Sequence, residues 1–193
     1  MTNENKQSLH VSALLGVALA ATGILGRLLL TAPNFNPAIA IAIFAGYLIK
    51  DRRIALASVI AMMGVSDLVI GFYDWRMMFF VYLGFVVAWL AGVAFSRWID
   101  SPQFRWKFAG VAAPAIISAC AFFLITNSAC CLIGWYPMSW SGLAASLTAG
   151  LPFFRSTLAS TFGFSILMFG SMFAIQSYLA SNRLAATNKL PVS

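Results

Sequence analysis

Residues 31–49 read TAPNFNPAIAIAIFAGYLI, and this stretch decides how the rest of the chain is interpreted. Its second part, residues 38–49, is an unbroken apolar run of 12 residues. A helix of that length rises only about 18 Å, whereas the hydrocarbon core of a bilayer is about 30 Å thick. Its first part, residues 31–37, holds two prolines and two asparagines, which disfavour a helix. Non-helical backbone lies at membrane depth only where protein buries it or water reaches it, so residues 31–37 are a candidate pocket wall.

The whole chain has the composition of an integral membrane protein. Of its 193 residues, 61% are hydrophobic and only 9% are charged, whereas a soluble domain has about 45 to 50% and about 25%. Mean hydropathy is +0.88. Six apolar runs follow one another, at residues 11–30, 38–49, 54–71, 77–95, 108–133 and 157–179. We therefore predict an all-α fold, with residues 1–193 forming a single domain, a polytopic bundle of six transmembrane helices.

Basic residues orient the predicted bundle. Three of them, Arg27, Arg76 and Arg155, fall on one side. Nine fall at the two termini and at the exits of the even-numbered helices: Lys6, Lys50, Arg52, Arg53, Arg97, Arg105, Lys107, Arg183 and Lys189. Because basic residues gather on the cytoplasmic side of short loops, we predict that both termini are cytoplasmic.

Two alternatives concern the first two runs. Residues 11–30 could be a signal peptide with a cleavage site at Ala18-Leu-Ala20, although the run is longer than the apolar part of such peptides. If residues 38–49 were re-entrant, the N-terminus would lie outside; we favour a tilted short span. Further along, residues 141–150 are predicted to form an interfacial helix that Pro152 ends.

Few residues in the chain are suited to catalysis, and we predict no enzyme. The one histidine, His10, lies at the predicted cytoplasmic start of the first helix, away from any nucleophile at the outer face. Cys130 and Cys131 are adjacent rather than spaced as Cys-x-x-Cys, and we expect them to be buried thiols. We expect no metal and no cofactor. The net charge of +7 is spread over short clusters, so we expect no nucleic-acid partner.

Two ionisable residues lie within apolar segments. Arg27 is near the outer end of the first run and Asp67 near the outer end of the third. An unpaired charge inside the bilayer costs on the order of 3 kcal/mol, so we expect Asp67 to pair with Arg27 or with Arg155. Such a pair either locks two helices together or lines a solute site, and the sequence leaves both interpretations open.

Each of the three predicted outer loops combines aromatic side chains with groups that form hydrogen bonds. Aromatic residues at this depth are typical of an interfacial belt. Aromatic residues together with a few placed polar groups are also what binding of a small, partly flat solute requires. The predicted solute site comprises Asn34, Asn36, Asp67, Tyr73, Trp75, Asn127, Trp135, Tyr136 and Arg155.

Two further patterns concern helix packing. Gly16-x-x-x-Ala20 places small residues on one face of the first helix, which allows close approach of another helix or of a partner subunit. Ile70-Gly-Phe-Tyr73 and Ile133-Gly-Trp-Tyr136 end the third and fifth predicted helices with a similar motif, which would fit a duplication of helical hairpins.

Several motifs carry a resemblance that covers most of the chain, from about residue 26 to residue 169. They are Pro33-Asn-Phe-Asn-Pro37, Phe44-Ala-Gly46, Ser66-Asp67, Gly71-Phe-Tyr73, Thr126-Asn127, Tyr136-Pro137, Gly142-Leu143 and Gly150-Leu-Pro-Phe-Phe-Arg-Ser-Thr157. In these the chain resembles a bacterial family of uncharacterised six-helix membrane proteins. Its architecture is in turn similar to that of the substrate-binding S components of energy-coupling-factor (ECF) vitamin transporters.

This resemblance implies six helices, cytoplasmic termini, a location in the bacterial cytoplasmic (inner) membrane, and a solute site formed by the outer loops. It also implies an energising transporter subunit that docks on the first helix, for which Gly16 and Ala20 are the nearest small residues. We therefore expect uptake of a small vitamin-like or precursor molecule from the outer face. The alternative is a structural or channel-forming bundle without a solute site.

Overall fold

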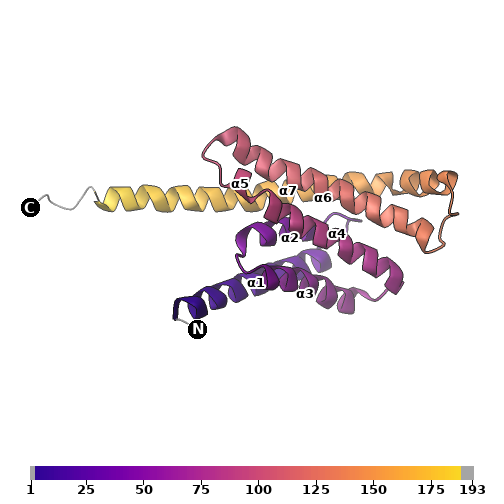
Figure 1. Cartoon of the computed structure of the whole chain (residues 1–193), viewed down its shortest axis with the longest axis horizontal. Helices are drawn as coiled ribbons and strands as arrows, with labels where there is room; N and C mark the ends of the chain where they lie inside the picture. The colour runs from indigo at the N-terminus through magenta and orange to yellow at the C-terminus, as the bar shows by residue number, and fades with distance from the viewer. Residues whose placement is uncertain (1–2, 188–193) are drawn as a thin grey trace, which may run out of the picture.

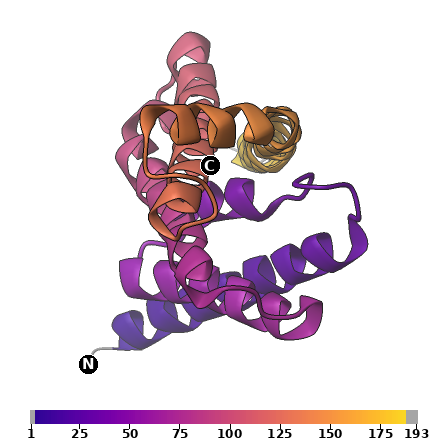
Figure 2. The ribbon, with the colours of Figure 1, turned by 90° about the vertical axis from the view of Figure 1, so that its right-hand side faces the viewer.

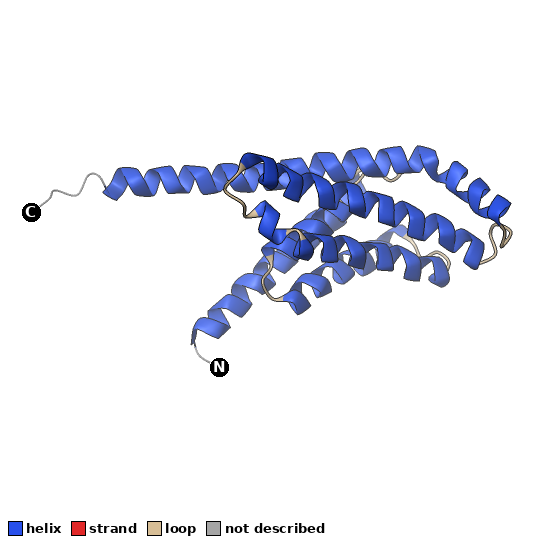
Figure 3. Ribbon diagram, turned by 45° about the horizontal axis from the view of Figure 1, so that its top comes forward, coloured by secondary structure: helices blue, strands red, loops and turns tan. Residues whose placement is uncertain are grey.

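The structure is a computed structural model that describes residues 3–187, so Lys189 lies outside the described residues. Every regular element in this part of the chain is a helix (Figures 1 and 3). The helices are α1 (Asn3–Leu29), α2 (Ala38–Leu48), α3 (Arg52–Ile70), α4 (Trp75–Ala94), α5 (Ser96–Ile99), α6 (Phe104–Leu132) and α7 (Trp140–Thr187). The predicted all-α fold is confirmed for this region.

Five of these helices, α1, α3, α4, α6 and α7, are long and apolar enough to cross a membrane. Large apolar side chains are exposed along them, for example Leu14, Leu68 and Leu167, which are 71%, 66% and 61% exposed. Such surfaces are typical of a bundle that lipid surrounds, because a soluble protein would bury them. The five long helices therefore make up a multi-pass membrane bundle.

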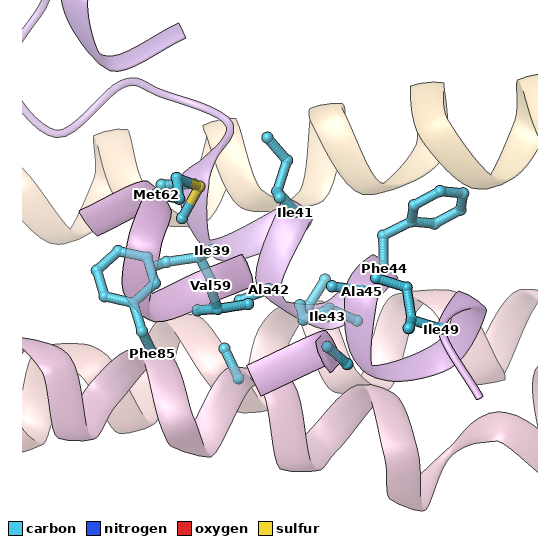
Figure 4. Close-up of a cluster of buried hydrophobic side chains, with 14 of the residues drawn as sticks. Ile39, Ile41, Ala42, Ile43, Phe44, Ala45, Ile49, Val59, Met62 and Phe85 are labelled. Carbon is cyan, nitrogen blue, oxygen red and sulfur yellow. The ribbon is translucent and has the colours of Figure 1, made fainter. Parts of the chain in front are cut away.

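The sixth apolar segment, α2, is short and lies at the centre of the bundle. All of its residues from Ala38 to Gly46 are buried, and Ile41 and Ile43 are at most 1% exposed. Figure 4 shows these side chains among Val59 and Met62 of α3 and Phe85 of α4. A helix that is apolar all round is stable only when it is covered on all sides, and the other helices supply that cover.

The course of α2 can be followed from its two ends. At its start, Pro37 packs against Gly26, in the last turn of α1. At its end, Leu48 and Lys50 border the same hollow as Gln7 and Ser8, in the first part of α1. The helix therefore runs antiparallel to α1 and returns the chain to the end of the bundle where α1 begins (Figure 1).

Two glycines bring the backbones of α2 and α4 into contact. A Cβ atom on Gly46 would overlap the carbonyl oxygen of Trp89, and a Cβ atom on Gly92 would overlap the carbonyl oxygen of Ile43. In a membrane, where the hydrophobic effect does not drive helices together, close approach at small residues is a main source of association. Gly46 and Gly92 thus fix the position of α2 against α4.

The last helix differs from its prediction. We expected an interfacial helix at residues 141–150 that Pro152 would end, followed by a span at residues 157–179. Instead α7 continues through Pro152 from Trp140 to Thr187. Proline removes one backbone hydrogen bond and bends a helix without necessarily ending it. Figure 2 shows the first part of α7 crossing the view before the remainder is seen end-on.

Each of the two similar motifs has a glycine with positive φ where its helix ends. Gly71, after α3, has φ of 112°, and Gly134, after α6, has φ of 87°. Both values lie in the left-handed region, which glycine adopts at helix ends without steric cost. The positive φ therefore explains the glycine in each motif, whether or not the two motifs arose by duplication.

The small-residue face of α1 is used within the chain. A Cβ atom on Gly16 would lie 3.3 Å from side-chain atoms of Ile54 and Ser58 in α3. Ala20, on the same face, packs against the central core. Gly16 and Ala20 therefore pack against α3 and the core within the chain, and docking of a transporter subunit on them stays a prediction.

The contact between α2 and α4 gives a first prediction. Gly46→Ala and Gly92→Ala should each lower the free energy of unfolding by about 2 to 3 kcal/mol, because the backbone atoms they meet cannot rotate away. Gly163→Ala is the control, since nothing lies within 4 Å of a Cβ atom there and alanine favours a helix by up to about 1 kcal/mol. Thermal unfolding of detergent-extracted protein measures all three. Unfolding temperatures for Gly46→Ala and Gly92→Ala equal to that of Gly163→Ala would contradict the close packing.

Candidate functional site

A cavity of about 380 Å³ lies among α4, α6 and α7. The side chains around it belong to the start of α4, the last three turns of α6, the bend of α7 and the loops at residues 34 and 135. They are Asn34, Met77, Val81, Phe122, Phe123, Thr126, Asn127, Cys130, Trp135, Gly150, Phe153, Phe154 and Thr157. Because α4 begins and α6 ends at this level, the cavity lies at the end of the bundle away from both termini (Figure 1). Its volume lies within the range of small-molecule sites, about 300 to 1,000 Å³.

Aromatic rings form much of the wall. Phe123 of α6 and Phe154 of α7 are in contact, with ring centroids 4.7 Å apart. Phe122 contacts Phe85 of α4 at 5.6 Å and so connects the wall to the central core. Rings held in this way by neighbouring rings keep their orientation and offer flat apolar faces.

The polar groups of the cavity come mainly from α6 and α7. The side-chain amide of Asn127 donates a hydrogen bond to the carbonyl oxygen of Phe123 at 2.8 Å. Gly150 lies directly opposite, and a Cβ atom there would overlap the amide of Asn127. Ser146 of α7 also donates to the backbone carbonyl of Asn127 at 2.9 Å. The bend of α7 is therefore packed around Asn127.

Asn34 reaches the cavity from the loop between α1 and α2. Its φ of 55° is left-handed, a conformation that asparagine adopts more readily than most residues. The hydroxyl of Ser160 in α7 donates to its carbonyl oxygen at 3.4 Å, and the ring of Phe35 contacts that of Phe164 at 5.9 Å. The loop thus crosses from α1 to α7, as the proposed pocket wall requires.

The buried charges form a separate cluster between α1, α3 and α4. A carboxylate oxygen of Asp67, which is 1% exposed, lies 2.7 Å from the guanidinium of Arg27. Its second oxygen accepts a hydrogen bond from the hydroxyl of Tyr82 at 3.0 Å. Arg27 also donates to the hydroxyl of Ser66. The partner of Asp67 is therefore Arg27; Arg155 is exposed and forms no ion pair among the described residues.

Two groups in the loop before α4 have shifted pKa values. Burial and the nearby negative charge of Asp67 raise the pKa of Tyr73 to about 12, and the charge of Arg27 opposes part of that rise. Hydrogen bonds from Arg76 hold the pKa of Asp74 below its usual value. Tyr73 therefore stays protonated and Asp74 stays ionised at neutral pH.

The predicted solute site is thus divided. Three of its members, Asn34, Asn127 and Trp135, border the 380 Å³ cavity, and Asn36 borders a smaller hollow of about 30 Å³ that it shares with Asn34. Two members, Asp67 and Tyr73, belong to the charge cluster. The remaining three, Trp75, Tyr136 and Arg155, do not line the 380 Å³ cavity. The structure therefore brings only part of the nine residues together, because residues at the same end of different helices need not face one another.

Sequence reasoning missed other lining residues, notably Met77, Phe122, Gly150 and Thr157. A signal was present in α6, where the lining residues 122, 123, 126, 127 and 130 recur at intervals of three and four and so lie on one helix face. The sequence pattern does not show which other helices meet this face of α6, because that depends on the tertiary structure. Among the residues searched, no three His, Cys, Asp or Glu side chains are grouped to hold a metal.

The bundle and its cavity define a multi-pass membrane protein with a small-molecule-sized hollow at one end. The chain belongs to DUF6580, a family of unknown function that matches residues 3–184. No curated protein and no solved structure matches the chain.

The charge cluster gives a second prediction. Asp67→Ala should lower the free energy of unfolding by about 3 to 5 kcal/mol, because Arg27 is left buried without its partner. The double variant Arg27→Ala with Asp67→Ala should be more stable than the sum of the single changes implies, since both charges are gone. Arg155→Ala, which removes an exposed cation, is the control and should change stability by less than about 0.5 kcal/mol. Strictly additive losses in chemical denaturation would contradict the pairing.

Proposed function

We propose that this protein is a membrane-embedded solute-binding protein, similar in role to the S components of ECF transporters. It would bind a small vitamin-like or precursor molecule in the cavity among α4, α6 and α7. The observation that carries the proposal is the combination of aromatic walls with a few placed polar groups in a hollow of about 380 Å³. Such a lining is typical of sites that bind small molecules.

The proposal is for binding and not for catalysis. The nucleophile on the cavity wall, Cys130, donates its thiol hydrogen to the carbonyl oxygen of Thr126 at 3.4 Å. The described lining residues include no histidine, lysine or carboxylate that could act as its base. Transport would then need an energising partner, which we place on the exposed side of α1, where Val11, Leu14 and Val17 face outward.

The orientation belongs to the same proposal. The basic residues favour a cytoplasmic location for the end that holds both termini. The cavity would then face the outer side of a bacterial inner membrane, with α2 as the sixth, tilted span. A solute arriving from outside would meet Asn34 and Trp135, both of which are exposed as well as bordering the cavity.

Cysteine labelling tests this orientation. In a variant whose native cysteines Cys120, Cys130 and Cys131 are replaced by alanine, Met138→Cys should react with an impermeant thiol reagent in intact cells. Gln103→Cys, which lies at the other end of the bundle, should react only after the membrane is permeabilised. Both native residues are exposed at the surface, so accessibility alone does not separate them. Labelling of Gln103→Cys in intact cells would reverse the proposed topology.

Mass spectrometry of small molecules that copurify with detergent-extracted protein tests solute binding. We expect one compound in the unmodified protein and at least about tenfold less of it in Gly150→Ala. The added Cβ would displace the amide of Asn127, whereas the lost hydrogen bond to Phe123 contributes only about 1 kcal/mol to folding. Gly163→Ala is the matched control, because it is the same substitution in the same helix and its Cβ atom would have no neighbour within 4 Å.

The two variants separate binding from folding. Equal retention in Gly150→Ala and Gly163→Ala would show that the compound binds elsewhere. The proposed function would be contradicted if the protein retains no compound and the extract of its growth medium does not raise its unfolding temperature.

A further inference from the structure

Three polar side chains of the cavity donate hydrogen bonds within their own helices. The hydroxyl of Thr126 donates to the carbonyl oxygen of Phe122 at 2.8 Å. The hydroxyl of Thr157 donates to the carbonyl oxygen of Phe153 at 3.0 Å. These bonds run along their own helices, so the hydroxyl oxygens retain lone pairs while their hydrogens are engaged.

Asn127 is engaged in part. It donates one of its two amide hydrogens to the carbonyl oxygen of Phe123 and keeps the other. The amide oxygen has no donor among the described residues. Two helices, α6 and α7, therefore present three acceptor oxygens to one cavity, against one remaining N–H of Asn127, and a bound molecule with hydrogen-bond donors matches this balance.

The cavity also has no charged lining residue within the described part of the chain. Of the charges at this end of the bundle, Arg27 pairs with Asp67 and Arg76 with Asp74, each at 2.7 Å, and Arg155 is exposed and does not line the cavity. Inside the cavity an anionic solute would meet acceptor oxygens and no cation. A cationic solute would meet no carboxylate. Either would lose its hydration without gaining a counter-charge, which is a large free-energy cost.

The walls limit the shape as well as the charge. Phe123 and Phe154 lie with their rings at 38° to each other, and Trp135 borders the same space. Flat apolar faces favour a ring that packs against them. At the open side, Asn34 makes no side-chain hydrogen bond among the described residues and offers both a donor and an acceptor.

We propose, building on the proposed function, that the solute is an uncharged, flat ring compound whose N–H or O–H groups donate to Thr126, Asn127 and Thr157. Asn34 then contacts the edge of the ring that faces the opening. Carboxylates and quaternary or protonated amines are therefore not solutes of this cavity.

The test uses an extract of the growth medium divided by ion exchange into neutral, acidic and basic fractions. Each fraction is incubated with the full-length protein in detergent, and retained compounds are identified by mass spectrometry. We expect retention from the neutral fraction alone. In Thr157→Val, which removes the acceptor oxygen but keeps the side-chain shape, retention should fall about three- to tenfold. In Thr157→Ser, which keeps the oxygen, it should stay within about twofold.

The outcomes separate this inference from the proposed function. Retention from the acidic or basic fraction would overturn the assigned class of solute and leave solute binding intact. Equal retention of a neutral compound by Thr157→Val, Thr157→Ser and the unmodified protein, all shown to be folded by their unfolding temperatures, would overturn the role of the acceptor oxygens. Retention from no fraction would overturn both proposals.

Discussion

The enclosure of α2 is the constraint on which the remainder of the structure depends. This helix of 11 residues is shorter than the hydrocarbon core of a bilayer and too apolar to lie in water, so it is stable only when the other helices surround it. Gly46 and Gly92 bring its backbone against α4. Because α2 starts level with Gly26, inside the end of α1, the loop of residues 30–37 occupies the depth that a longer helix would fill. That loop then carries Asn34 to the cavity.

Charge is separated from the cavity by the same arrangement. Arg27 and Asp67 join α1 to α3 and engage Tyr82 of α4, on one side of α2. The cavity lies on the other side, among α4, α6 and α7. A buried ion pair adds little net stability, but removing either partner is costly. The pair therefore fixes which helices meet, while the site itself stays neutral.

Much of the fold follows from the sequence, because long apolar runs and a proline-rich interruption have few solutions in a membrane. The run of residues 38–49 and the irregular stretch before it lie where they were expected. The start of α7 was misjudged because hydropathy falls near Ser141 and Pro152 breaks the pattern, whereas the backbone hydrogen bonds continue around the bend. Small residues such as Gly16 indicate close approach but not the neighbour, which here is α3.

The candidate site shows the same limit in another form. Asn127, Trp135 and Asn34 could be placed at one end of the bundle from topology alone, but so could Trp75 and Arg155, which do not line the cavity. The difference arises from rotation of each helix about its axis, and that rotation is set by contacts such as Gly84 against Phe122 and Gly150 against Asn127. Gly150 and Asn127 belong to the second half of the chain, whereas Asn34 comes from the first. A solute that contacts both asparagines is therefore held between the part of the bundle that Arg27 and Asp67 join and the part that the aromatic walls form.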